Sequence, residues 1–265
     1  VDVVRRLVAD MKAQAPDHVA VTGDLINIGL PHEHAAALAW LETVGAPDHV
    51  SIVPDNHDIY TPLHTAPGVG LWRSYMSSHD PTITDTDGLV FPYVRNFGEI
   101  ALVGVNSAVP TPLGHATGLV DDAQLSRLAD VLKRLGAAGQ MRVVLIHHPP
   151  LVGQARPRRA LVNAAEVERV LTEHGAELVL HGHNHVNSLE WRQGPAHAFA
   201  VIGIASASHY NAAQVDRRAR YNLYRIAFSG GQPRIEMIGR GFATADGPVE
   251  QLEQCELVRQ PAHAP

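Results

Sequence analysis

The sequence has almost no cysteine, since Cys255 is the only one among 265 residues. A disulfide framework within the chain is therefore excluded, and so is a zinc site built from several cysteines. No run of about 18 apolar residues is present, so no segment is expected to span a membrane. The lone cysteine, together with the lack of a visible signal segment, favours a cytoplasmic protein.

Positive charge is also scarce, because 21 lysines and arginines face 27 aspartates and glutamates and leave a formal net charge of −6. A chain with this balance has no bulk attraction for nucleic acid or for an anionic membrane, so neither is an expected partner. Apolar residues make up 45% of the sequence, which is enough for a substantial core. The excess is in histidine, with 17 copies, and histidine is the commonest metal ligand.

The chain alternates helical and strand patterns and then changes to strands alone. Helical spacing is found in residues 1–15, 31–44, 121–135 and 164–174, and short apolar runs typical of strands in 18–22, 50–53, 100–105, 142–146 and 177–180. Further strands without helices between them are expected at 198–205, 221–228 and 234–238, with Gly230-Gly231 as a hairpin turn. This order predicts an α/β fold in one domain over residues 1–265, with 247–265 as a loosely held tail.

Polar side chains of the kind that bind metals follow four of these strand runs directly. The runs end at Asp24, at Asn56-His57-Asp58, at His147-His148 and at His183-Asn184-His185. Ligands of α/β sheets gather beyond the carboxyl ends of the strands, so we expect the four loops to meet. One carboxylate, one amide and at least three imidazoles form a mixed set that suits Zn²⁺, Mn²⁺ or Fe. Each motif alone is more often a turn or an exposed strand end, and it is their joint position that predicts a metal site.

In their order and spacing these motifs resemble those of the calcineurin-like metallophosphoesterase superfamily. The matching segments are Gly23-Asp24, Asp55-Asn56-His57-Asp58, His147-His148-Pro149-Pro150 and Gly182-His183-Asn184-His185. The resemblance implies a layered α/β/β/α sandwich, in which two packed mixed sheets are flanked by helices. It also implies hydrolysis of phosphoesters by metal-activated hydroxide at a dinuclear centre.

The resemblance further implies a ligand set for two divalent ions, which would be Mn, Fe or Zn. Asp24 would bridge the two ions and His185 would bind the first of them. The second ion would be held by Asn56, His147 and His183.

Residues that act on the substrate are implied in the same way. His57 would stabilise the transition state or protonate the leaving oxygen, and Asp58 would orient it. His148 follows a ligand and is expected to face the substrate, as is Arg156, because arginine suits phosphate recognition.

The His-His-Pro-Pro segment is similar to that of bacterial cyclic-nucleotide and glycerophosphodiester phosphodiesterases, which implies a small soluble phosphodiester as substrate. Three alternatives stay open: a phosphomonoesterase, a nucleotide-lipid pyrophosphatase and a non-catalytic binding descendant of the fold. The pyrophosphatase reading needs an apolar cap, and the segment 62–88 is rather polar for one.

The sequence departs from the family pattern in two places. The Asp-x-His motif on the family's first strand is absent, and we expect that strand to precede the sequence given rather than to have been lost. Asp55 stands where the family usually has glycine, and its added charge would either disturb Asn56 or supply an extra ligand.

Overall fold

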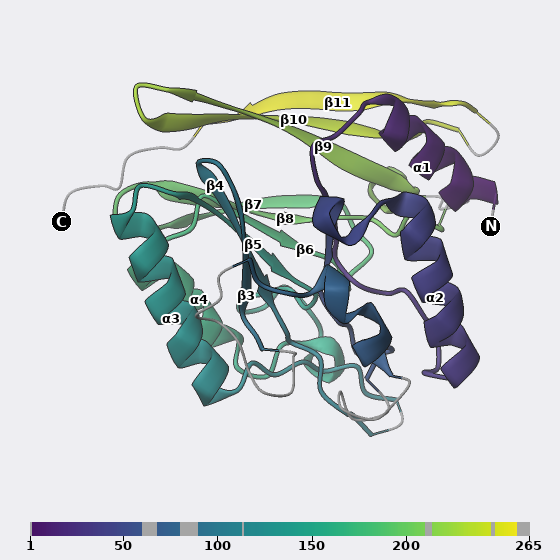
Figure 1. Ribbon diagram of the computed structural model, residues 1–265, viewed down its shortest axis with the longest axis horizontal. Coiled ribbons are helices and arrows are strands. Elements are labelled where there is room, and N and C mark those ends of the chain that lie inside the picture. The colour runs from purple at the N-terminus through teal and green to yellow at the C-terminus, as the bar shows by residue number, and fades with distance from the viewer. Residues whose placement is uncertain are drawn as a thin grey trace.

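The structure is a computed structural model that describes residues 2–59, 68–79, 90–112, 114–209, 214–244 and 247–258. Strands in two layers are covered by helices (Figure 1), as expected for a layered α/β fold. Within these ranges no helix is both long enough and apolar enough to cross a membrane.

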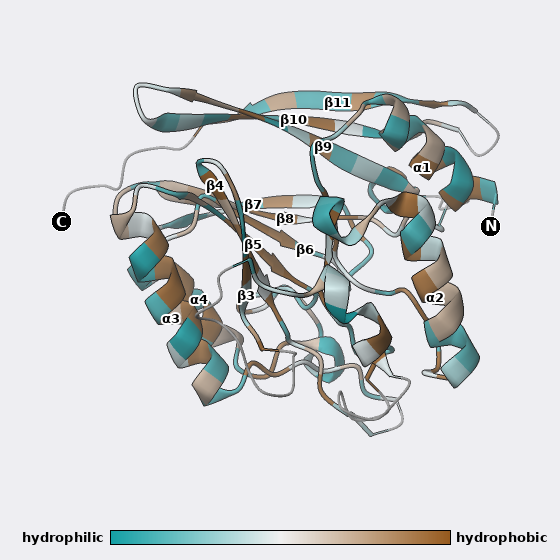
Figure 2. Ribbon diagram, in the orientation of Figure 1, coloured by the Kyte–Doolittle hydropathy of each residue, from teal (hydrophilic) through white to brown (hydrophobic). Residues whose placement is uncertain are grey.

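The larger sheet has six strands in the order β3-β4-β5-β6-β8-β7. Its four inner strands run parallel, and they are β4 (Ile100–Val105), β5 (Met141–Ile146), β6 (Leu178–His181) and β8 (Ala198–Gly203). These strands carry mostly hydrophobic residues (Figure 2), because both faces of the sheet are covered. The edge strands β3 (Tyr93–Phe97) and β7 (Ser188–Gln193) are antiparallel to their neighbours.

The second layer of strands is divided into two smaller sheets. In the first, β1 (Val19–Val21) pairs in parallel with β2 (Val50–Ile52). The other is an antiparallel sheet of β9 (Arg220–Ser229), β10 (Gln232–Phe242) and β11 (Val249–Leu257). The turn between β9 and β10 contains Gly230 and Gly231, both at positive φ, as the hairpin prediction required.

Four helices and four 3₁₀ turns lie in the part of the chain that the structure describes. The helices are α1 (Asp2–Ala13), α2 (Pro31–Val44), α3 (Asp122–Ala137) and α4 (Ala164–His174), and the 3₁₀ turns are η1 (Pro47–His49), η2 (Val69–Tyr75), η3 (Pro157–Arg159) and η4 (Val215–Arg217). The carboxylate of Asp121 caps α3 by accepting the N–H of Gln124 at 2.7 Å. Helices α3 and α4 pack on one face of the large sheet, whereas α1 packs on the antiparallel sheet.

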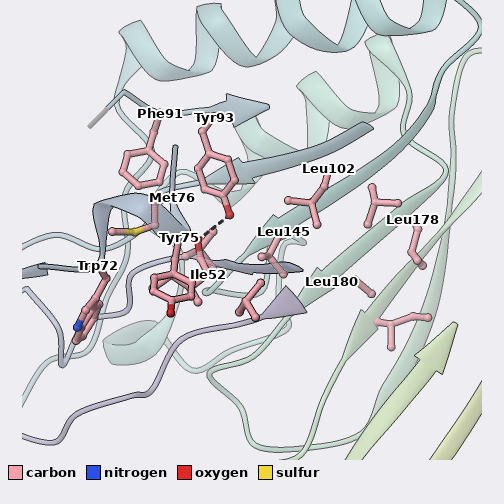
Figure 3. Packing of buried hydrophobic residues seen from close by; sticks show 14 of the residues in the cluster. Ile52, Trp72, Tyr75, Met76, Phe91, Tyr93, Leu102, Leu145, Leu178 and Leu180 are labelled. Carbon is pink, nitrogen blue, oxygen red and sulfur yellow. Dashed lines mark hydrogen bonds between the residues drawn. The ribbon is translucent and has the colours of Figure 1, made fainter. Parts of the chain in front are cut away.

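The main core lies between the two layers of strands. Leu102, Leu145 and Leu180 point into it from the large sheet, and Ile52 from β2 (Figure 3). The hydroxyl of Tyr93 donates a hydrogen bond of 2.7 Å to the carbonyl oxygen of Ile52. This bond ties the large sheet to β2 just before the Asp55-Asn56 loop, so it helps to place that loop.

Three elements differ from the sequence-based expectation. Strands β3 and β7 were not predicted, because each is an edge strand that lacks a long apolar run. The prediction of a loosely held tail was wrong for residues 249–257, which form β11. This strand is polar because it is an edge whose backbone pairs with β10 while many of its side chains face solvent. The remainder of the tail, 259–265, lies outside the described residues.

Candidate metal centre

The structure brings the predicted ligand loops together at the carboxyl ends of the strands. Asp24 follows β1 and Asn56 follows β2, while His147 follows β5 and the two other histidines follow β6. Two contacts join loops from different sheets or strands. Nε2 of His185 lies 2.6 Å from Oδ2 of Asp24, and Nε2 of His147 lies 3.1 Å from Nδ1 of His183.

The backbone at three of these ligands adopts a conformation that L-residues rarely use. The φ angle is 60° at Asp24, 64° at His183 and 52° at His185. Among the described residues only one other non-glycine residue, Ala15, has a positive φ. Such conformations cost free energy and cluster at functional sites, because surrounding structure must hold them in place. Three of them in one cluster therefore indicate a site built for a purpose other than stability.

Gly23 has to be glycine because the ligand loops approach its Cα closely. A Cβ atom at this position would lie 2.8 Å from Nδ1 of His147 and 2.9 Å from Cβ of Asp55. Its φ of 98° is also one that glycine adopts readily. The small residue allows the end of β1 to pack directly against two other loops.

The two buried histidines are held in the neutral form that binds metals. Nδ1 of His147 donates a hydrogen bond of 2.6 Å to the carbonyl oxygen of Thr22, so the proton of the neutral ring is on Nδ1. The other ring nitrogen, Nε2, therefore carries a lone pair, and it faces His183. Burial lowers the pKa of His147, and burial together with nearby His147 lowers the pKa of His183 to about 3. Both rings are therefore free to donate lone pairs at neutral pH.

Several polar atoms in the cluster are buried without a protein partner in the described part of the chain. They include both side-chain atoms of Asn56, Nε2 of His183 and Oδ1 of Asp58. A buried polar group without a hydrogen bond costs about 1–3 kcal/mol. A metal ion bound to the Asn56 oxygen and the His183 nitrogen would compensate two of these atoms, so the residues fit a metal.

Asp24 supplies the negative charge of the cluster. Burial raises the pKa of its carboxyl, but the hydrogen bond from His185 and the neighbouring imidazole groups outweigh that effect and lower the pKa overall. Asp24 is therefore an ionised carboxylate between imidazole groups, as a metal ligand must be.

His57 lies at the same edge and is half-buried. Its Nδ1 donates to the carbonyl oxygen of Asn27 at 2.6 Å, which orients the ring. The carboxylate of Asp58 is buried and accepts the N–H of Asp55 at 3.0 Å. The orienting role that we expect of Asp58 toward His57 stays a prediction.

The two residues expected to meet the substrate differ in exposure, and the contact of each with substrate stays a prediction. His148 is fully buried, and its ring nitrogens lie 2.8 Å from the hydroxyl oxygen of Ser107 and 3.3 Å from the carbonyl oxygen of Ala116. It packs against the rings of His147 and His183, and ligand atoms of the three histidines lie within 4.8 Å of one another. Arg156 is exposed and precedes the 3₁₀ turn η3.

The arginine that touches the ligand loop is Arg159, three positions after Arg156. Its Nη2 donates a hydrogen bond of 2.9 Å to the carbonyl oxygen of His183, and the rest of the residue is exposed. Its charge also contributes to the lowered pKa values of His147 and His183, although burial is the larger cause. Both Arg156 and Arg159 lie in the same basic segment, and only the fold shows which one points to the ligands.

The sequence profile of the calcineurin-like phosphoesterases matches residues 1–187, which include all the ligand loops. The chain belongs to this family. The family is named for phosphoesterases, and the cluster of histidines and aspartates described above is the candidate metal-binding site of this chain.

A curated relative agrees with this assignment to the family. The glycerophosphodiester phosphodiesterase GpdQ from Enterobacter lignolyticus (strain SCF1) is 27% identical over 184 residues, which are 68% of this chain and 60% of the relative. This chain thus matches less than two thirds of that protein's length.

Solved structures support the fold. A dimetal phosphatase from Danio rerio superposes with a TM-score of 0.61 at 15% identity, covering 97% of this chain and 88% of its own. The sulfate thiohydrolase SoxB from Thermus thermophilus superposes with a TM-score of 0.50 at 18% identity. The superposition covers 98% of this chain and 42% of the SoxB chain. At these identities the likeness concerns the fold alone.

Proposed function

We propose that the chain hydrolyses small phosphodiesters at a centre of two divalent metal ions. The observation that carries the proposal is the convergence of Asp24, Asn56 and the three ligand histidines, with buried donor atoms left unpaired, in a chain of the phosphoesterase family. The mixed oxygen and nitrogen set favours Mn, Fe or Zn over Mg²⁺ or Ca²⁺.

The ligands are divided between the two ions in this proposal. Asp24 and His185 would hold the first ion, and Asn56, His147 and His183, together with Asp24, would hold the second. When bound, such a pair supplies Lewis-acid stabilisation of phosphate oxygens and a water of lowered pKa.

His57 is proposed to act on the substrate without holding a metal. Its ring is half-buried at the edge of the cluster, and Nδ1 is already engaged by the carbonyl oxygen of Asn27. In this role Nε2 would donate a proton to the leaving oxygen or a hydrogen bond to the phosphoryl group. Asp58 supports the loop that carries it.

Arg159 is proposed as the arginine that binds the phosphate of the substrate. One end of its guanidinium is held by the carbonyl oxygen of His183, and the side chain is otherwise exposed at the site. A guanidinium can present two parallel N–H groups to phosphate oxygens, so a fixed arginine beside the metals suits this task. Arg156 and His148, which the sequence favoured, lack such a position.

A diester is favoured over a monoester because the relative GpdQ is named as a glycerophosphodiester phosphodiesterase. The test is hydrolysis of bis(p-nitrophenyl) phosphate and of p-nitrophenyl phosphate by metal-stripped protein to which Mn²⁺, Zn²⁺ or Fe²⁺ is returned. Metal-restored cleavage that is faster for the diester supports the proposal. Faster monoester cleavage would make the chain a phosphomonoesterase, and metal binding without any turnover would favour a non-catalytic descendant.

A further inference from the structure

Asp55 is a buried acidic residue that the proposed chemistry does not use. It lies between β2 and Asn56, and its side chain is inaccessible to solvent. Its two carboxylate oxygens accept three peptide N–H groups. Oδ2 accepts the N–H of Asp24, while Oδ1 accepts those of His57 at 2.5 Å and Asp58 at 2.9 Å.

These hydrogen bonds connect two loops that are distant in sequence. Asp24 lies 31 positions before Asp55 and follows a different strand. The contact to Asp24 reaches the backbone of a residue whose φ is 60°, a conformation that needs support from its surroundings. The contacts to His57 and Asp58 close the loop that carries the proposed acid. A single carboxylate thus fixes a metal ligand and a substrate-contacting histidine relative to each other.

The loop around Asp55 is closed from the other direction as well. The carboxylate of Asp58 accepts the N–H of Asp55 at 3.0 Å, so the two acidic residues exchange backbone contacts.

We propose that Asp55 is a positioning residue, whose carboxylate holds Asp24 and His57 in the geometry that the metal centre needs. The inference rests on the proposed function, since it assumes that Asp24 binds a metal. The competing hypothesis is that Asp55 is itself a metal ligand. It is suggested by the carboxylate of Asp55, which lies within 4.8 Å of possible ligand atoms of Asp24 and His147. Positioning is favoured because both oxygens already accept peptide N–H groups.

The substitution Asp55→Asn distinguishes a positioning role from a ligand role, and it changes the side-chain volume little. An asparagine can still accept the N–H groups of His57 and Asp58 with its one oxygen, but its amide would then place N–H groups against the N–H of Asp24. Asp121→Asn is the matched control. That carboxylate also accepts a backbone N–H, from Gln124 at 2.7 Å, but it caps α3 away from the ligand cluster.

The experiment is isothermal titration of metal-stripped protein with Mn²⁺ at pH 8, together with the melting temperature of each metal-free variant. We expect Asp55→Asn to bind the same number of ions as the wild type with affinity lowered about 10–100-fold, the loss typical when a ligand loses its supporting contact. Asp121→Asn should keep the wild-type affinity. Asp55→Ala, which removes the carboxylate without restoring the glycine that the family usually has here, serves as a second variant and should weaken binding at least as much.

Each other outcome overturns the inference in an identifiable way. The loss of one bound ion in Asp55→Asn would make Asp55 a ligand. Unchanged affinity in both Asp55 variants, with normal binding by the wild type, would contradict the positioning role and leave the proposed function intact. No binding by the folded wild type would contradict the metal centre itself, and the role of Asp55 with it.

Discussion

The imidazole of His185 and the carboxylate of Asp24, 161 positions apart in the chain, meet with Nε2 and Oδ2 separated by 2.6 Å. The contact joins the loop after β6 in the large sheet to the loop after β1 in the small one. Both residues have a positive φ, so the fold holds both loops in costly conformations to make the contact. In the proposed centre the same two groups are the ligands of the first metal.

Replacing either residue should therefore weaken metal binding more than it weakens the fold. We expect Asp24→Asn and His185→Ala to bind metal more weakly than the wild type. The loss of affinity should exceed the roughly 10–100-fold that is typical when a hydrogen-bond partner of a metal ligand is removed. Titration calorimetry measures the affinity. In the wild type, Mn²⁺ at 100 times its Kd should stabilise the protein by about 2.7 kcal/mol, which EDTA should reverse. A melting temperature that does not respond to metal or EDTA would contradict the site.

Asn56 and His57 are neighbours in the chain, but the first is a proposed metal ligand and the second is proposed to act on the substrate. His57→Ala should reduce kcat about 10²–10⁴-fold, the usual loss for a general acid, and keep its metal content. Asn56→Ala should reduce metal occupancy, because it removes a ligand. Metal analysis alongside steady-state kinetics checks both. Equal loss of metal in the two variants would refute the separate role of His57.

Arg159 and Arg156 provide a matched pair for substrate binding. Arg159→Ala should lower kcat/KM about 10–100-fold, because a hydrogen bond to a charged group contributes about 1.5–3 kcal/mol. Arg156→Ala changes the net charge equally and should leave kcat/KM close to that of the wild type. Phosphate inhibition should weaken in parallel for Arg159→Ala alone. Equal effects of the two substitutions would reduce the role of Arg159 to general electrostatic attraction.

Asp10 offers a test of the fold that is independent of the metal centre. Its carboxylate accepts hydrogen bonds from Nε and Nη2 of Arg240, at 2.7 and 2.8 Å, and from the hydroxyl of Tyr221, at 2.5 Å. These bonds tie α1 to β9 and β10. The hydrogen bond from Arg240 is the main reason that the pKa of Asp10 is lowered in the folded state. The stabilisation is therefore complete above the unfolded pKa of about 3.9 and is lost as the pH falls through the lower folded value.

Asp10→Asn should accordingly lower the free energy of unfolding by about 1–3 kcal/mol at pH 7. The difference from the wild type should shrink below pH 4. Urea titrations at pH 7 and pH 3 measure both quantities. The exposed pair of Arg169 and Glu173 on α4 is the control, and Glu173→Gln should change stability little at either pH. An Asp10→Asn effect of the same size at both pH values would contradict the electrostatic explanation.

The parts of the molecule that the sequence predicts are those with a local signal. Short apolar runs followed by Asp24, Asn56 and His147 reveal strands and their polar ends, because alternation and turn chemistry act over a few residues, although β1, before Asp24, is only partly buried. The order of these runs is enough to place the ligands at one edge, since parallel strands share the direction of their carboxyl ends.

The features that the sequence does not reveal depend on contacts between distant segments. His148 is buried because Ser107 and Ala116, from the loop after β4, cover its ring. Arg159 contacts the carbonyl oxygen of His183 only once η3 and the loop after β6 are folded together. Strand β11 is held by its backbone pairing with β10, which leaves little trace in side-chain pattern.

The most direct test of the metal centre is anomalous diffraction from crystals of the protein soaked in Zn²⁺. We expect two peaks at the carboxyl ends of the strands, about 2.0–2.2 Å from their ligand atoms. One peak should contact Asp24 and His185, and the other Asn56, His147 and His183, with Asp24 shared. Peaks only at surface histidines, or none in this cluster, would contradict the central claim that these five residues form a metal site.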